Sequence, residues 1–189
     1  MDARQLRTRA RLARAILDLA ATKPVSDITV SELASKAEIN RSTFYEHSDS
    51  PTALLRSVLR EELDEIRHRH LDSVDDVAAS VRAVTLAVLA HVDAHETIYV
   101  RSLGDDNASE LHSMLSAHFE STMHTLFDTG AIVPPTAGDP ALAKATAARF
   151  IADGTVGAID VWIHSPAPRD AEKFLAAYLA VMPAWWPLS

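Results

Sequence analysis

The stretch TVSELASKAEINRSTFYEHS, residues 29–48, contains two short helical patterns separated by a break near residues 38–40. Thr29 and Glu32 have the spacing of a capping box, in which a hydroxyl and a carboxylate each satisfy a free amide at a helix start. Asn40 is a favourable N-cap residue for the second helix, which we expect over residues 41–47. The stretch therefore predicts two short helices joined by a tight corner.

The second of these helices is expected to expose nearly all of its side chains and to bury only Phe44. A helix, a corner and a helix make up the helix-turn-helix arrangement, whose second helix enters the major groove of DNA. Arginine pairs with guanine or phosphate, and hydroxyl groups donate to phosphates or bases. The alternative is a helical corner with a solvated face. The candidate DNA-binding residues are Thr29, Arg41, Ser42, Thr43, Tyr45 and His47.

The charge of the chain is distributed unevenly. The net charge is −8, which argues against a general nucleic-acid coat protein. Residues 1–47 nevertheless carry eight Lys and Arg against six Asp and Glu, whereas residues 71–189 carry six against fifteen. A helix predicted over residues 3–22, before Pro24, places several arginines on one face, which is either a solvated face or part of a DNA-binding surface. The asymmetry indicates two tasks for the two ends of the chain.

The remaining sequence predicts a helical body. Ser50-Pro51, Asp75 or Asp76, and Asp139-Pro140 are helix starts, and Gly130 is a helix end. No period-two strand pattern persists, so we expect an all-α fold of about nine helices, with a DNA-binding domain at 1–48 and a ligand-binding and dimerisation domain at 49–189. The helices of the body are expected over residues 51–71, 77–94, 96–103, 107–129, 140–164 and 169–182.

Composition bounds the other functional classes. The absence of cysteine excludes disulfides and thiolate chemistry. No signal peptide and no run of eighteen apolar residues is present, so we expect a cytoplasmic protein without a membrane partner. No nucleophile elbow or glycine-rich phosphate loop is present, and we expect neither an enzyme nor a cofactor. His91 and His95, four residues apart, are either a metal-binding pair that lacks a nameable third ligand or an ordinary pair, and an enzyme hypothesis would rest on the histidines alone.

The segment ITVSELASKAEINRSTFYEHS, followed by SPTALL, resembles the N-terminal region of TetR-family transcriptional regulators over about residues 5–60. The resemblance implies a three-helix DNA-binding head, a helical body, a homodimer on a palindromic operator and, usually, repression relieved by a small molecule. Two positions depart from the family pattern: Ser48 replaces a common phenylalanine, and Pro51 replaces a lysine that commonly contacts phosphate. The matching residues are Thr29, Val30, Leu33, Ala34, Ala37, Ile39, Thr43, Phe44, Tyr45, His47 and Leu54.

The same resemblance implies that the last two long helices pair with their copies in a dimer. Small residues lie on nearly one face of the helix expected over residues 140–164, where they allow close approach either between subunits or within the chain. Aromatic residues of the last helix would add interface area. The candidate interface residues are Gly154, Gly157, Ala158, Phe174 and Tyr178.

The resemblance also implies an effector site within the body, between the helices expected at 77–94, 96–103, 109–129 and 140–164. The candidate lining is largely apolar, so we expect a mostly apolar small molecule; the alternative is that these residues form ordinary core. For the whole protein, the alternative is a helical ligand-binding or interaction protein whose head no longer reads DNA. The candidate ligand-binding residues are Tyr99, Met114, His118, Phe119, Met123, Phe150 and Trp162.

Overall fold

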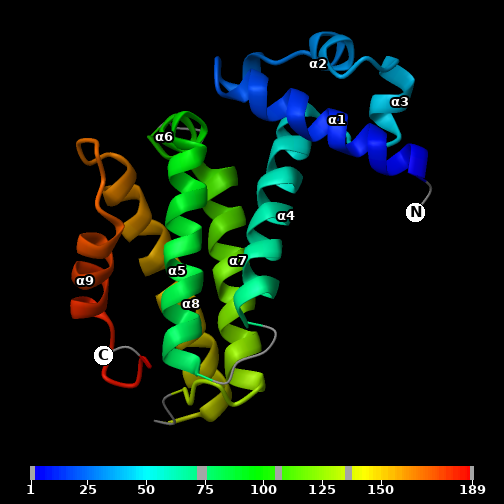
Figure 1. Ribbon diagram of the computed structural model, residues 1–189. Helices are drawn as coiled ribbons and strands as arrows, with labels where there is room; N and C mark the ends of the chain where they lie inside the picture. Colours follow the sequence, from blue (N-terminus) through cyan, green and yellow to red (C-terminus); the bar gives the residue numbers. More distant parts are fainter. Residues whose placement is uncertain (1–2, 72–75, 105–107, 135–137, 188–189) are drawn as a thin grey trace.

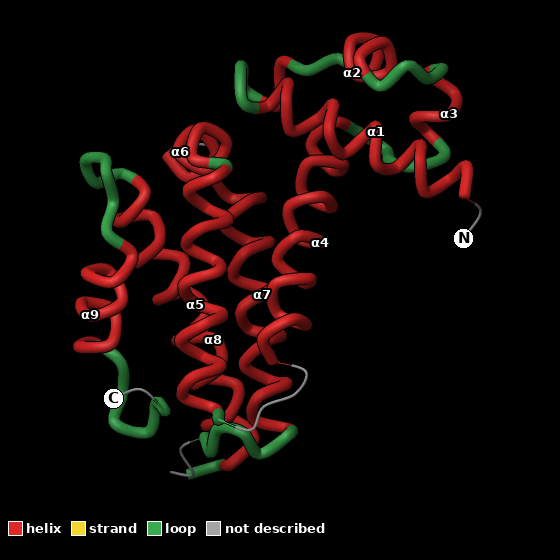
Figure 2. The backbone as a smooth tube through the Cα atoms, viewed as in Figure 1, coloured by secondary structure: helices red, strands yellow, loops and turns green. Residues whose placement is uncertain are grey.

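The computed structural model describes residues 3–71, 76–104, 108–134 and 138–187. Within these ranges the fold is all-α, as the sequence predicts, with nine α-helices and one turn of 3-10 helix. Figure 2 shows helices joined by loops throughout this part of the chain. A small N-terminal head sits above a larger helical bundle, and α4 runs from one into the other (Figure 1).

The head consists of α1 (Ala3–Ala20), the 3-10 turn η1 (Val25–Asp27), α2 (Val30–Lys36) and α3 (Arg41–Tyr45). Helix α1 ends at residue 20, two residues earlier than predicted. Helix α3 also ends two residues early, because His47 and Ser48 both donate their amides to the carbonyl of Phe44 and close the helix in a turn. A helix of five residues is too short to be stable alone, so tertiary contacts must hold α3 in place.

The predicted capping box at the start of α2 is confirmed. The amide of Glu32 donates to the Thr29 hydroxyl over 3.2 Å. The Glu32 carboxylate accepts from Lys23 Nζ at 2.6 Å and from the Thr29 amide. The hydrogen bond from Lys23 is the main reason why the pKa of Glu32 lies below its usual value, and the Thr29 amide lowers it further. Local hydrogen bonds therefore define where α2 begins.

The corner between α2 and α3 is a Schellman motif. The amide of Glu38 donates to the Ser35 carbonyl at 3.1 Å, and the amide of Ile39 donates to the Ala34 carbonyl at 2.9 Å. The motif requires a left-handed residue, and Glu38 takes that place with φ 54°, although glycine is the usual occupant. Asn40 has the extended backbone of an N-cap, but its side chain makes no capping hydrogen bond, so the predicted side-chain cap is wrong.

The bundle contains α4 (Pro51–Leu71), α5 (Val77–Ala94), α6 (Glu96–Gly104), α7 (Ala108–Asp128), α8 (Pro140–Ile163) and α9 (Ala171–Val181). Ser50, Asp76 and Asp139 cap α4, α5 and α8 through their side chains, as predicted. Gly130, with φ 73°, follows the end of α7. Helix α8 packs along α7, and α5 packs between α4 and α9 (Figure 1).

The last helix begins later than predicted. Asp170 accepts from the amides of Glu172 and Lys173 and so caps α9, which starts at residue 171 rather than 169. Arg169 instead turns inward and donates to Asp93 at 3.0 Å and to Glu96 at 2.5 Å. This buried guanidinium holds the segment before α9 against the junction of α5 and α6.

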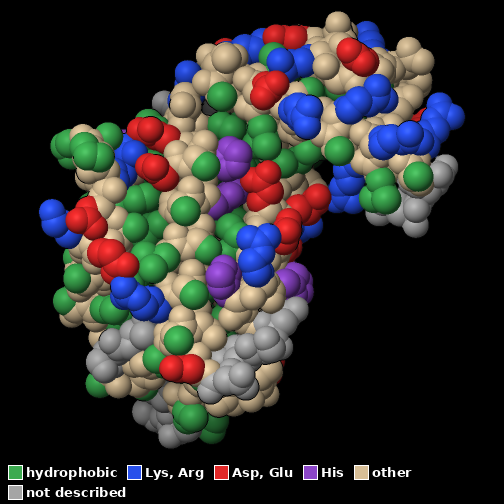
Figure 3. Space-filling model, viewed as in Figure 1, with side chains coloured by type: hydrophobic (Ala, Val, Ile, Leu, Met, Phe, Trp, Pro, Cys, Tyr) green, Lys and Arg blue, Asp and Glu red, His purple; other side chains and the backbone are tan. Residues whose placement is uncertain are grey.

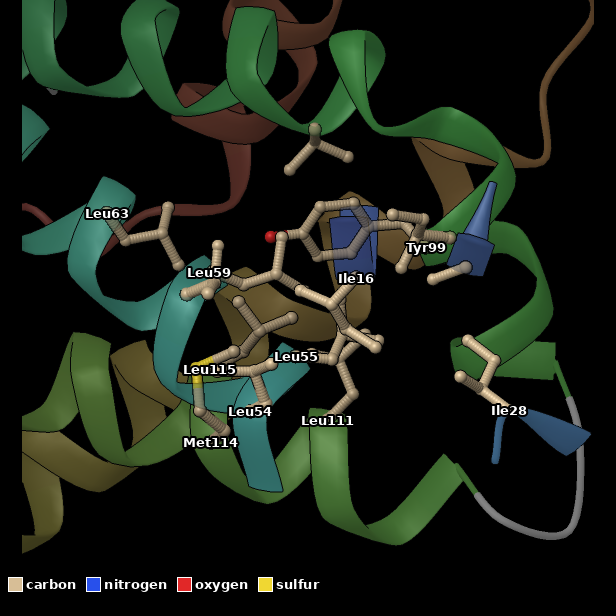
Figure 4. Packing of buried hydrophobic residues seen from close by; sticks show 14 of the residues in the cluster. Ile16, Ile28, Leu54, Leu55, Leu59, Leu63, Tyr99, Leu111, Met114 and Leu115 are labelled. Atoms are coloured by element: carbon tan, nitrogen blue, oxygen red, sulfur yellow. The ribbon is translucent and has the colours of Figure 1, made fainter. Parts of the chain in front are cut away.

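One hydrophobic core runs through both the head and the bundle. Ile16 of α1, Leu59 of α4, Tyr99 of α6 and Leu115 of α7 belong to the same buried cluster (Figure 4). Arg101 of α6 also donates to the carbonyl of Ala20 at the end of α1, over 3.2 Å. The division at residues 48 and 49 remains a prediction, because the two proposed domains share this core.

Although the sequence contains no run of eighteen apolar residues, α5 is long enough and apolar enough to cross a membrane by length and composition alone. It contains the charged residues Arg82 and Asp93. It packs against α4, α6, α8 and α9, and its side chains Val81, Val88, Leu89 and Val92 are buried in the bundle.

We predict that Phe44→Ala destabilises the protein by about 3–5 kcal/mol, because Phe44 is 0% exposed and no other side chain anchors α3 in the core. The neighbouring Tyr45→Ala, at a position that is 54% exposed, is the matched control and should cost about 0.5 kcal/mol or less. Urea unfolding followed by circular dichroism measures both. Equal costs for the two variants would contradict the assigned packing of α3.

Candidate DNA-binding surface and ligand cavity

Helix α3 presents a polar face to solvent because Phe44 turns the opposite face into the head. Arg41, Ser42 and Tyr45 are exposed, and Thr43 and His47 are half-buried. Among the described residues, the side chains of Arg41, Ser42 and Tyr45 have no hydrogen-bond or ion-pair partner. The candidate residues of α3 therefore lie together on one accessible surface with unused donors.

Thr29 lies at the N-cap of α2, where its hydroxyl oxygen accepts from the Glu32 amide. The hydroxyl proton remains available to an external acceptor. Ser48, one of the departures from the family pattern, is half-buried and donates to the carbonyl of Ser50 at 3.1 Å. It therefore orders the connection into α4 through a hydrogen bond. Pro51 occupies the first turn of α4, where a missing amide costs nothing.

The arginines of α1 are partly engaged within the molecule. Arg9 forms an ion pair with Glu61 of α4, and Arg11 donates to the carbonyl of Glu38 at 3.4 Å. Figure 3 shows Lys and Arg side chains gathered on the visible face of the head. Arg11, on the arginine face of α1, thus contacts the corner, whereas Arg9, on another side of the helix, ties α1 to α4.

An apolar cavity of about 80 Å³ lies within the bundle. His118, Phe119 and Met123 line it, as the sequence analysis expected of an effector site. Its walls come from α4, α5, α7, α8 and α9 and from Trp186 after α9, and no described side chain of α6 lines it. The α4 residues Leu63, Arg67 and Leu71 were missed, although their spacing of four residues places them on one helical face.

The other candidate lining residues lie elsewhere. Tyr99 and Trp162 are buried core residues that do not line this cavity. The Tyr99 hydroxyl forms a hydrogen bond with His91 Nε2, and the Trp162 ring packs beside that of Phe174. Met114 faces a separate groove between α4 and α7. Phe150 is 69% exposed on the outer face of α8, so its expected place in the cavity is wrong. Phe150 precedes Gly154 by four residues, and this helical spacing puts both on the same outward face.

One edge of the cavity is polar. His118 Nδ1 lies 3.2 Å from Asp64 Oδ1, and burial lowers the pKa of His118 although Asp64 opposes that shift. Arg67 lines both the cavity and the groove between α4 and α7 that Met114 faces. This groove has a volume of about 770 Å³ and also contains Arg56 and Arg60. The buried Nε of Arg67 has no hydrogen-bond partner among the described residues. The cavity therefore borders a guanidinium group that has a free donor.

The candidate interface residues divide between two surfaces. Gly154 and Gly157 face outward, and a Cβ added to either would meet nothing within 4 Å. Ala158 is half-buried beside them, whereas Phe174 and Tyr178 face inward and line the cavity. The outward face also carries exposed apolar side chains that the sequence analysis did not assign to it. These are Leu142, Phe150 and Val161 of α8; Val181, at the end of α9, is also exposed.

This architecture was compared with known proteins by sequence and by structure. No family model matches the chain. An uncharacterized helix-turn-helix transcriptional regulator of Bacillus subtilis (strain 168), YxbF, is 37% identical over 67 residues, which are 35% of this chain and 18% of that protein. Solved structures also resemble nearly the whole chain, and two of them, each at 18% sequence identity, serve as examples.

The first is a TetR transcriptional regulator from Streptococcus agalactiae 2603V, with a TM-score of 0.66 over 95% of each chain. The second is FadR of Thermus thermophilus, a TetR-family repressor solved in complex with lauroyl-CoA, with a TM-score of 0.62 over 91% of each chain. The fold and the head thus define a helix-turn-helix architecture joined to a helical bundle. More specifically, the chain has the fold of TetR-family transcriptional regulators, which confirms the resemblance at the level of the fold.

Proposed function

We propose that the chain is a TetR-family regulator of transcription that binds a palindromic operator as a homodimer and releases it when a small molecule binds. The observation that carries this proposal is the exposed, hydrogen-bonding face of α3, anchored by Phe44 and the Schellman corner. The proposal requires neither a catalytic group nor a cofactor, and it places the protein in the cytoplasm with the DNA.

In this proposal α3 enters the major groove, as the second helix of a helix-turn-helix does. Arg41 is free to pair with a guanine edge through two hydrogen bonds. Ser42, Thr43, Tyr45 and His47 supply further donors, and the Thr29 hydroxyl reaches a phosphate beside the groove. The dipole of α4 and the amide of Thr52 in its first turn attract a second phosphate, in place of the lysine that Pro51 replaces; the next two amides already donate to Ser50.

We predict that Arg41→Ala weakens binding to the preferred operator by about 1–3 kcal/mol, because a bidentate contact with guanine is lost. Fluorescence anisotropy at two salt concentrations, on a duplex selected from a random pool, measures the change. Arg82→Ala, on α5 in the bundle and paired with Glu172, is the control and should bind as the wild type does. Wild-type affinity in both Arg41→Ala and Tyr45→Phe would contradict the reading role of α3. A wild-type protein that binds no duplex at low salt would favour the alternative of a helical ligand-binding protein without DNA recognition.

For the homodimer, we propose that the outward face of α8 packs against its copy, with the end of α9 at its margin. Glycines let helices approach closely, and Phe150 and Val161 would bury apolar area on the same face. A two-fold axis along this face makes the interface self-complementary and presents two copies of α3 to successive turns of DNA, about 34–36 Å apart. Phe174 and Tyr178 would then support the interface from beneath.

We predict that Gly157→Leu converts the dimer to a folded monomer, because a side chain at this position projects from the protomer into its copy. Within one chain the added side chain meets open space, and replacing a helical glycine should stabilise the protomer by up to about 1 kcal/mol. Light scattering coupled to size exclusion measures the mass. Ala90→Leu, at an exposed position of α5, is the matched control and should stay dimeric. A dimeric Gly157→Leu variant would place the interface elsewhere.

For the effector, we propose an apolar molecule with one anionic group. The apolar walls of the cavity suit a hydrocarbon body, and the free donor of Arg67 suits a carboxylate or phosphate at its edge. The relative from Thermus thermophilus was solved with lauroyl-CoA, which has both features. Ligand sites commonly measure about 300–1,000 Å³, so a cavity of about 80 Å³ must widen to admit such a molecule. Because α4 forms one wall and also carries the head, widening would move α3.

We predict that dodecanoate and lauroyl-CoA weaken operator binding and that operator DNA weakens their binding by the same factor, as linkage requires. A hundredfold effect corresponds to a coupling of about 2.7 kcal/mol. Arg67→Met should lower the affinity for dodecanoate about tenfold or more but leave that for dodecanol nearly unchanged, because the alcohol carries no charge. Calorimetric titrations with and without operator measure these values. Ligands that bind equally well in both conditions would contradict the proposed release.

A further inference from the structure

Three polar side chains converge where α4, α5 and α6 meet. Glu62 Oε2 of α4 lies 2.9 Å from His95 Nε2 and 3.4 Å from His91 Nδ1. One potential ligand atom from each of the three residues lies within 4.8 Å of the other two. The spacing of His91 and His95 in the sequence indicates a pair, and the folded chain adds a carboxylate from a helix far upstream. The third ligand that the sequence did not reveal is therefore present.

The second nitrogen of His91 has a partner of its own. His91 Nε2 lies 2.9 Å from the hydroxyl of Tyr99, which is 0% exposed. A tyrosine hydroxyl both donates and accepts, so it satisfies either tautomer of His91. When Nε2–H donates to Tyr99, the lone pair of Nδ1 faces the Glu62 carboxylate, and a cation between the two would be bound by both. This is the arrangement of metal-bound histidines, whose remaining N–H donates to a neighbouring acceptor.

The cluster is reachable from solvent. The side chains of Glu62 and His95 are 37% and 20% exposed, whereas that of His91 is 6% exposed. Figure 3 shows histidine side chains at the surface beside acidic ones, below the head. One buried and two accessible ligands leave a side open to water, as in three-ligand metal sites.

We propose that Glu62, His91 and His95 bind one divalent transition-metal ion, and that the bound ion fastens α4 to α5. Two imidazoles and a carboxylate suit Zn²⁺ and, by the same donor chemistry, Co²⁺ and Ni²⁺. Bond lengths near 2.0–2.2 Å around a tetrahedral ion place ligand atoms about 3.2–3.6 Å apart. The separations from Glu62 already approach this range, so small side-chain rotations complete the site.

Fastening α4 to α5 has a consequence that rests on the proposed function. Glu62 lies on α4 between the head-side residue Leu59 and the cavity residue Leu63. An ion at this point restrains the helix that would transmit effector binding to α3. Metal binding itself depends on neither DNA nor effector, so the two proposals can fail separately.

The test uses the full chain, without an affinity tag of histidines, titrated with Zn²⁺ in a competition assay against a chromophoric chelator. Co²⁺ absorption then reports the coordination geometry. Wild type should bind one ion per chain, and about a hundredfold excess over Kd should raise the Tm by roughly 5–10 °C. Amide exchange in α4 and α5 around the three ligands should slow when Zn²⁺ is present.

Two variants remove ligands from accessible positions and should keep the fold: Glu62→Gln and His95→Asn. Each should weaken Zn²⁺ binding by more than about a hundredfold, since changes to outer partners alone cost about 10–100-fold. Tyr99→Phe, which keeps the buried ring, should weaken Zn²⁺ binding by only about 10–100-fold. The matched control is His164→Ala, because His164 also faces a carboxylate, Asp160 Oδ1, at 3.2 Å but on an exposed helix end.

The result expected is a loss of binding in the two ligand variants, a smaller loss in Tyr99→Phe and none in His164→Ala. Wild type that binds Zn²⁺, Co²⁺ and Ni²⁺ no more tightly than Glu62→Gln would overturn the proposal, and the cluster would then be a hydrogen-bonded group only. Equal binding by every variant would overturn it as well, because the ion would lie elsewhere. Loss of DNA binding in any of these proteins bears on the proposed function and not on the metal site.

Discussion

The packing of α4 against both the head and the bundle is the constraint on which the rest of the structure depends. Leu55 and Leu59 belong to the buried cluster that includes Ile16 of the head and Tyr99 of α6, and Leu63 continues into the cavity wall. A single helix therefore determines both the orientation of the head and the shape of the cavity. Because well-packed interiors do not deform continuously, a ligand that widens the cavity must shift this helix as a unit.

Helix α3 illustrates how a functional surface is held without stability of its own. Five residues cannot maintain a helix in water, and almost every side chain of α3 points outward. Phe44 supplies the one buried anchor, and the Schellman corner with Glu38 at φ 54° sets the angle at which α3 leaves α2. The proposed DNA contacts thus depend on a corner and an anchor that do not themselves touch DNA.

Two partly buried polar clusters join α4 to its neighbours in the bundle. Glu62 meets His91 and His95 toward α5, and Asp64 meets His118 toward α7. Buried polar groups are costly unless they are paired, so each cluster specifies how α4 lies against one neighbour. The proposed ion and the proposed effector would both act on this helix, one by fixing it to α5 and the other by displacing it from the cavity.

The sequence by itself determined the all-α class, the start of α2 at Thr29, the cap Asp139, a cap at Asp75 or Asp76, and the outward face of α3 around Phe44. These features depend on hydrogen bonds within four residues and on helical period, both of which are readable along the chain. Only the tertiary structure decided that Phe150 faces outward, that α4 and α9 wall the cavity while no described side chain of α6 does, and that Glu62 joins His91 and His95. The rotation and lateral position of each helix depend on contacts between residues far apart in the chain, and periodicity within one helix does not specify which neighbour its face will meet.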